Sequence, residues 1–168
     1  MRKTTSLLVL AAVAGFSGVA CVAQAGCSSE TVKGDYAFRV SGEVFSNPVV
    51  YRDGIALAHF DGGHTLSQVD FVLANGVPVA GPPDYNGFHT DETGTYRVNE
   101  NCTGEAEINF PTPPGGTSGA VVKLFFVISE GGRRLNTIVT SLTPPNTKVA
   151  VPANIHSDAI RVEVGPFK

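Results

Sequence analysis

The feature that most restricts the fold of this chain is a two-residue alternation of apolar and polar side chains. It is clearest at 34–45, "GDYAFRVSGEVF", where Tyr36 and Phe38 begin an apolar face and Arg39 and Glu43 lie opposite. Successive side chains of an extended strand point to opposite faces, so this pattern predicts a strand with one buried side. After residue 27, no stretch keeps the 3.6-residue apolar period of an amphipathic helix for three turns.

Seven further stretches of similar composition predict strands, and the 19 glycines and 11 prolines gather mainly between them. Eight strands joined mostly by hairpins predict an all-β domain with a single antiparallel β-barrel, and a β-sandwich is the alternative. Strand lengths near eleven residues favour the barrel, because closure leaves no edge strand. The expected strands are 34–45, 50–60, 64–74, 88–99, 103–110, 120–130, 133–142 and 159–164, with 147–151 as a possible short addition.

The first 25 residues have the organisation of a bacterial secretory signal peptide. A basic start, "MRK", precedes the apolar run "LLVLAAVAGF" and the small-residue triplet that ends at Ala25. The run is shorter than the roughly 20 apolar residues that a membrane-spanning helix needs. We expect 1–25 to be removed and 26–168 to form one secreted or periplasmic domain. A buried N-terminal helix or a retained anchor is the alternative.

Removal of the signal peptide leaves two of the three cysteines, Cys27 and Cys102. In an oxidising compartment, two surviving cysteines most simply form a disulfide. This bond would tie the chain before the first strand to the end of a later strand, and we expect it to clamp the entrance of the barrel. The alternative is lipidation of Cys27, because "QAGC" partly resembles a lipoprotein box. Lipid anchoring would leave Cys102 unpaired.

The charge pattern argues against two classes of partner. Without Arg2 and Lys3, 10 basic residues remain against 15 acidic ones, a net charge of −5. Nucleic acids and anionic membrane surfaces both bind clustered Lys and Arg, and Arg133-Arg134 is the only basic pair left in 26–168. We expect neither partner and no cofactor, and the oligomeric state stays open.

Three stretches occur together and in order: "KGDYAFRVSG" shortly after Cys27, "GIALAHFDGGHTLS" at 54–67, and "TGTYRVNENCTGEAEI" at 93–108 followed by "LFFVISEGGRRLNTIVT". Together they resemble a family of uncharacterised secreted bacterial proteins with a compact β-barrel. That family is similar to the allene oxide cyclase-like, calycin-type barrels. The resemblance spans roughly 27–142 and implies the same barrel, an architecture whose members include cyclases and small-ligand carriers. Its motifs are structural, so it transfers no catalytic residue.

Inward aromatic side chains offer a candidate ligand site. Tyr36, Phe38 and Phe71, with either Phe125 or Phe126, are positioned to line a cavity for an apolar molecule. The same residues would also fill a solid core, because side chains alone can fill an eight-stranded barrel. The sequence leaves both arrangements open.

Polar residues give weaker signals. His59 and His64 flank Asp61 at a turn, but no third metal ligand can be named, so we expect Asp61 to cap its own turn and predict no metal site. Glu105 and Glu107 alternate with apolar residues and should face solvent.

Asp91 and Glu92 sit near a strand start, and we expect both on the surface. Arg39 and Glu43 would enter the barrel only if the first alternation were reversed. No Gly-x-Ser-x-Gly element indicates a serine hydrolase, and the catalytic residues, if any, stay unknown.

Three functions fit these observations. The first is binding of a small apolar or amphipathic molecule in the barrel mouth, under the Pro- and Gly-rich loops at 75–87 and 111–119. The second is an isomerase or cyclase of the allene oxide cyclase-like sort, in which the pocket folds a reactive substrate and excludes water. The third is a structural or interaction protein of the cell envelope without a cavity.

Overall fold

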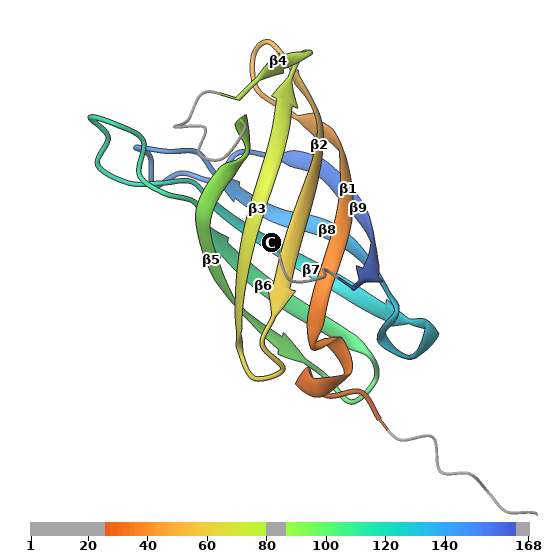
Figure 1. Ribbon diagram of the computed structural model, residues 1–168. Coiled ribbons are helices and arrows are strands. Elements are labelled where there is room, and N and C mark those ends of the chain that lie inside the picture. The colour runs from red at the N-terminus through yellow and green to blue at the C-terminus, as the bar shows by residue number, and fades with distance from the viewer. Residues whose placement is uncertain (1–25, 80–86, 164–168) are drawn as a thin grey trace, which may run out of the picture.

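The computed structural model describes residues 26–79 and 87–163, and the predicted signal peptide lies outside them. Within these residues, no helix has the length and hydrophobicity that a membrane-spanning helix needs. The elements (Figure 1) are η1 Ser29–Val32, β1 Gly34–Val44, β2 Val50–Phe60, β3 Thr65–Ala74, β4 Val77–Pro78, β5 His89–Val98, β6 Thr103–Asn109, β7 Val121–Ser129, η3 Glu130–Gly132, β8 Arg134–Thr143 and β9 Ala153–Val162.

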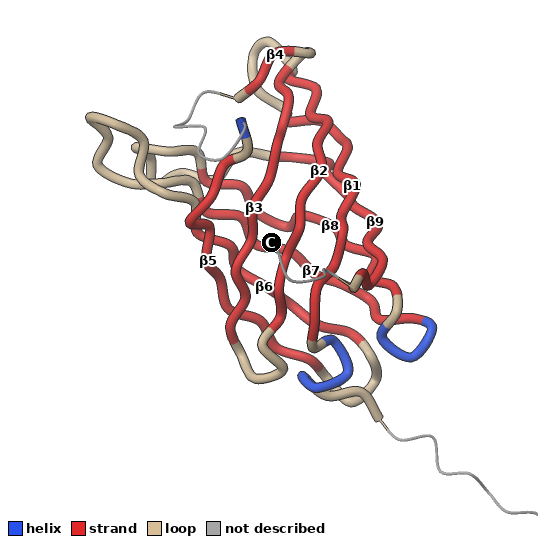
Figure 2. Tube along the Cα trace, viewed as in Figure 1, coloured by secondary structure: helices blue, strands red, loops and turns tan. Residues whose placement is uncertain are grey.

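Eight strands close into an antiparallel barrel (Figure 2). The hydrogen-bonded neighbours follow the order β2-β1-β9-β8-β7-β6-β5-β3, and β3 pairs back with β2. The short β4 adds to the end of β3. Because the ring is closed, the eight barrel strands have neighbours on both sides, which removes the exposed edges of an open sheet. The predicted antiparallel barrel is confirmed, and the sandwich alternative does not occur.

The alternation predicted for the first strand is present in β1. Tyr36 is fully buried, Phe38 lines the interior, and Arg39 is exposed, so the reversed arrangement does not occur. Glu105 and Glu107 on β6 also face outward, where each forms an ion pair with a surface Arg or Lys. The two-residue period therefore assigned these faces correctly.

The last strand is longer than its sequence pattern indicates. We expected it to start at residue 159, but β9 starts at Ala153 and pairs with β1 and β8. Its first half turns the hydroxyl of Ser157 inward, so the apolar alternation is weak there. The short strand expected at 147–151 reduces to one isolated bridge between Leu142 and Val151.

One end of the barrel is closed by aromatic side chains. The rings of Tyr36 and Tyr96 both pack edge-on against Phe60, with centroid distances of 5.5 and 5.0 Å. The Tyr36 hydroxyl donates to the carbonyl of Gly132 and accepts from the guanidinium of Arg161. These contacts link β1, β2, β5, β9 and η3 across the barrel axis and form its floor.

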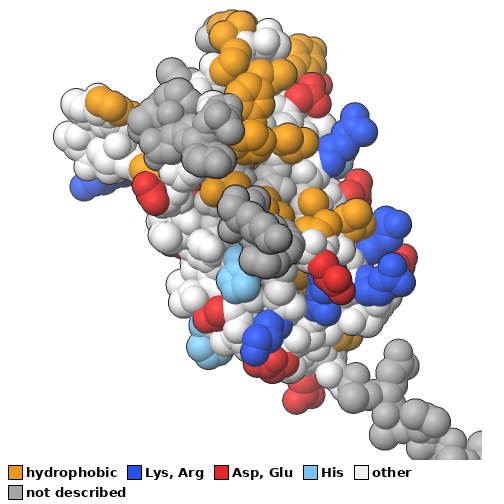
Figure 3. Space-filling model, in the orientation of Figure 1, with side chains coloured by type: hydrophobic (Ala, Val, Ile, Leu, Met, Phe, Trp, Pro, Cys, Tyr) orange, Lys and Arg blue, Asp and Glu red, His pale blue; other side chains and the backbone are white. Residues whose placement is uncertain are grey.

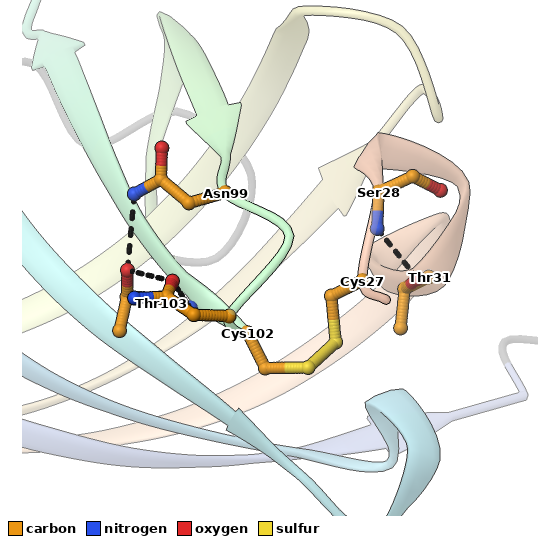
Figure 4. Close-up of a disulfide and its surroundings, with 7 residues drawn as sticks. Cys27, Ser28, Thr31, Asn99, Cys102 and Thr103 are labelled. Atoms are coloured by element: carbon orange, nitrogen blue, oxygen red, sulfur yellow. Dashed lines mark hydrogen bonds between the residues drawn. A yellow bond between two sulfur atoms is a disulfide. The ribbon is translucent and has the colours of Figure 1, made fainter. Parts of the chain in front are cut away.

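The disulfide joins the segment before η1 to the turn between β5 and β6, both of which lie at this end of the barrel in Figure 1. Cys27 and Cys102 are bonded (Figure 4), with 4.9 Å between their Cα atoms, and the backbone N–H of Cys27 donates to the carbonyl of Glu100. The bond ties these two segments together, as predicted. It does not clamp the entrance, however, because the long loops lie at the opposite end. A lipid-anchored form at Cys27 would need that thiol free.

The other end of the barrel is the mouth. The loops between β6 and β7 and between β8 and β9 lie side by side there (Figure 1), joined by hydrogen bonds from the backbone of Thr117 and Ser118 to Asn146 Oδ1. The turn between β1 and β2 and the short β4 lie at the same end. The predicted loops around the mouth are therefore present where the structure describes them, and residues 80–86 lie outside the described part.

Replacing both Cys27 and Cys102 with Ser should lower stability without opening the mouth. The bond closes a loop of 75 residues, for which the chain-entropy model gives about 4 kcal/mol, and this corresponds to a fall in Tm of roughly 10 °C for a domain of this size. Thermal melts followed by circular dichroism, with and without reductant, measure the change. Equal Tm values for the oxidised and reduced wild-type protein would contradict this role.

Candidate functional site

A cavity of about 270 Å³ occupies the barrel between its aromatic floor and its mouth. Its wall is mostly apolar, and the inward faces of all eight barrel strands contribute to it. The lining residues are Phe38, Val40, Val44, Arg52, Ala56, Ala58, Phe60, Leu66, Gln68, Asp70, Val72, Val79, His89, Ala106, Ile108, Phe110, Ala120, Val122, Leu124, Phe126, Leu135, Thr137, Val139, Leu142, Pro144, Pro145, Val151, Ile155 and Ser157. The interior is therefore a partly open chamber and not the solid core that the sequence also allowed.

The three aromatic residues predicted to bind a ligand lie in different places. Phe38 lines the cavity, and of the adjacent Phe125 and Phe126 only Phe126 does. Tyr36 is part of the floor. Phe71 lies on the other face of β3, where its ring packs against Phe88 at 5.9 Å, because Leu66 and the residues at even positions after it turn inward. Contact of these aromatics with a ligand stays a prediction.

The wall formed by β3 and β5 carries a buried polar cluster, which we call the acid cluster: Asp70, His89 and Glu92. Asp70 is 4% exposed and Glu92 is fully buried. His89 Nδ1 lies 3.1 Å from Asp70 Oδ1, and the side-chain amide of Gln68 donates to Glu92 Oε2 at 2.8 Å. Asp70 and His89 both line the cavity, so the cluster borders the space open to a ligand.

Burial changes the acid–base properties of the two carboxyl groups. Loss of solvation raises the pKa of Glu92 to about 9, and the neighbouring charge of Asp70 adds to this. Loss of solvation also raises the pKa of Asp70, although its contacts with Glu92 and His89 oppose the shift. Two carboxyl groups this close together and shielded from water do not both ionise easily. At neutral pH the Glu92 side chain is therefore a neutral acid.

A local irregularity of β5 brings the cluster together. Gln68 pairs with Glu92 and Asp70 pairs with His89, so two steps along β3 match three steps along β5. Asp91, whose φ is 62°, is the additional residue of β5. Such a β-bulge re-aims the side chains beside it, and here His89 and Glu92 both face the interior.

Our expectation that Glu92 lies on the surface is therefore wrong. The sequence did contain a signal, because Glu92, Gly94 and Tyr96 share one face of β5 and Tyr96 is buried. His89 is at an odd position of β5, whereas Glu92, Gly94 and Tyr96 are at even ones. Regular alternation would therefore place His89 on the outer face, and only the bulge turns it inward.

Arg52 supplies a cation near the mouth. It lies at the start of β2, lines the cavity and is half-buried, and loss of solvation lowers its pKa. It forms no ion pair with any residue in the described part of the chain. A half-buried guanidinium that has no ion-pair partner among the described residues is suited to an anionic or strongly hydrogen-bonding group of a ligand.

The histidines flanking the turn at 61–64 do not form a site with Asp61. Asp61 accepts hydrogen bonds from the backbone N–H groups of Gly63 and Thr65, as expected for a residue that caps its own turn. His59 instead pairs with Asp35 on the surface, at 2.7 Å.

Together these features define a closed eight-stranded antiparallel β-barrel with an internal cavity, an apolar wall and a buried acid cluster. In comparisons with known proteins, no family model, curated protein or solved structure matches the chain. The barrel agrees with the fold implied by the resemblance to allene oxide cyclase-like and calycin-type proteins. The relationship itself stays a prediction.

The buried Glu92 carboxyl should make stability fall as pH rises. Its pKa in the folded protein, about 9, lies above the value of 4.5 for an exposed glutamate. Between these values the folded state holds a proton that the unfolded state has lost, so unfolding becomes easier with rising pH, by up to about 1.4 kcal/mol per unit. In Glu92→Gln this contribution disappears. Melts from pH 5 to 10 in EDTA-containing buffer measure both slopes.

The matched control is Glu107→Gln, which removes a surface ion pair and should shift stability by less than about 0.5 kcal/mol at any pH. If stability changes with pH in the same way in the wild-type protein and in Glu92→Gln, the buried Glu92 does not retain its proton in the folded state.

Proposed function

We propose that this protein is an exported β-barrel that binds a small apolar or amphipathic molecule in its interior. The observation that supports this most is the cavity of about 270 Å³ with its apolar wall and few polar groups. Ligand sites in proteins have this composition, in which apolar surface provides affinity and a few polar groups provide orientation. The disulfide is consistent with an oxidising extracellular compartment. A cavity that borders a buried polar group also favours binding or catalysis over a purely structural role.

The rim of the mouth supports an apolar ligand. Phe45, Val49 and Val77 are 48%, 40% and 64% exposed there, on the β1–β2 turn and on β4. The hydrophobic side chains visible in Figure 3 are most numerous around the end of the barrel that bears β4. Apolar surface around an opening gives an apolar molecule contact before it reaches the interior.

A cavity-filling substitution should separate binding inside the barrel from binding on its surface. Ala56 faces the cavity, and the adjacent Ile55 is 51% exposed on the outer face of β2. In Ala56→Phe the added ring occupies the cavity, so binding of the neutral fluorescent probe N-phenyl-1-naphthylamine should be lost. In Ile55→Phe it should be unchanged. Fluorescence titration measures both, and equal binding by the two variants would place the probe outside the barrel.

Arg52 should select for an anionic head group. The probe 1-anilinonaphthalene-8-sulfonate carries a sulfonate that N-phenyl-1-naphthylamine lacks. In Arg52→Gln, affinity for the sulfonated probe should fall roughly tenfold, the effect of losing one charge-assisted hydrogen bond. Affinity for the neutral probe should stay unchanged. The control is Arg39→Gln on the outer face of β1, and an equal loss for both probes in Arg52→Gln would exclude charge recognition.

The acid cluster supports a second candidate function, an isomerase or cyclase of the allene oxide cyclase-like sort. A neutral Glu92 can donate a proton, and Asp70 and His89 border the cavity where a substrate would lie. The two functions differ in the fate of the bound molecule. Native mass spectrometry of the secreted protein identifies a co-purifying molecule, and incubation with that molecule shows whether it is released unchanged or converted.

A further inference from the structure

The acid cluster has the geometry of a metal site. One potential ligand atom from each of Asp70, His89 and Glu92 lies within 4.8 Å of the other two. Ligand atoms about 2.0–2.2 Å from a common metal ion are separated by roughly 3–4.4 Å. An upper bound of 4.8 Å is close to this range, so the three side chains lie near the spacing that a common ion requires.

The hydrogen bonding of Glu92 gives an independent sign of a ligand. Glu92 is fully buried and its Oε2 accepts from Gln68, but its Oε1 has no hydrogen-bond partner. Buried polar atoms in folded proteins are nearly always partnered, because an unpartnered one costs about 1–3 kcal/mol. Glu92 is one of the three residues of the cluster, so a cation bound by its carboxylate would give this side chain a further partner.

The charges of the cluster fit a divalent cation. Asp70 and Glu92 bring two carboxyl groups into a wall where no described Lys or Arg pairs with either of them. Arg52 lines the same cavity but forms no ion pair with any of the residues that the structure describes. Once an ion displaces the proton that Glu92 otherwise holds, two carboxylates and a neutral imidazole around a divalent ion have no net charge, which lowers the cost of burying all three groups.

We propose that Asp70, His89 and Glu92 bind a divalent transition-metal ion of the Zn²⁺ type. The imidazole nitrogen favours such an ion over Mg²⁺ or Ca²⁺, which prefer oxygen ligands alone. Since Asp70 and His89 line the cavity, an ion held by them would lie at the cavity wall. The proposal departs from the sequence-based expectation of no metal site, and it holds whether or not the barrel carries an organic ligand.

The test uses the full mature protein, stripped of metal with EDTA and dialysed. Isothermal titration with ZnCl₂ should show one equivalent of bound ion, and CaCl₂ should bind at least roughly tenfold more weakly. Added Zn²⁺ should also raise Tm, because an ion that binds only the folded state stabilises it. In His89→Ala and in Glu92→Gln, Zn²⁺ affinity should fall by roughly tenfold or more.

The matched control is His59→Ala, which removes the other His–Asp pair, His59 with Asp35, from the exposed surface. Its Zn²⁺ affinity should equal that of the wild-type protein. Circular dichroism confirms that each variant is folded, and Glu92→Gln keeps the shape of the neutral side chain. The proposal fails if the wild-type protein binds no Zn²⁺, or if His89→Ala and Glu92→Gln bind it as tightly as the wild-type protein does.

Discussion

Closure of the sheet through the pairing of β3 with β2 is the constraint on which the rest of this structure depends. Once the ring is closed, every second side chain of eight strands points into one enclosed space. The aromatic floor fills that space at one end, through Tyr36, Phe60 and Tyr96. Small side chains such as Ala56, Ala58 and Ala106 leave it incompletely filled further up, and the cavity is the result.

The same closure removes polar residues on the inner face of the barrel from solvent. A carboxyl group on an open, one-sided sheet would be solvated, whereas Asp70 and Glu92 are held in a wall that water reaches poorly. A retained proton and a bound cation each lower the free-energy cost of burying these carboxyl groups, and each also gives the cluster a chemical function. A retained proton makes Glu92 an acid, and a bound cation makes the cluster a coordination site. The half-buried Arg52 adds a positive group nearer the mouth.

Sequence reasoning succeeded where a local side-chain pattern, or for the disulfide the number of cysteines left to pair, decides the outcome. It predicted the faces of β1 and β6, the cap formed by Asp61 and the pairing of Cys27 with Cys102. It failed where a long-range partner decides the outcome. The first half of β9 becomes a strand because β1 and β8 lie on either side of it, although its own alternation is weak.

The sequence by itself determined an all-β chain with alternating faces, turns rich in glycine and proline, and a cysteine pair, because these follow from side-chain periodicity and backbone preferences over a few residues. Only the tertiary structure decided that the interior contains a cavity, that the disulfide lies at the end away from the mouth, and that Asp70, His89 and Glu92 meet. The physical reason is that enclosed volume depends on how all eight strands pack. The orientation of His89 depends on a bulge whose register is fixed by pairing with a neighbouring strand.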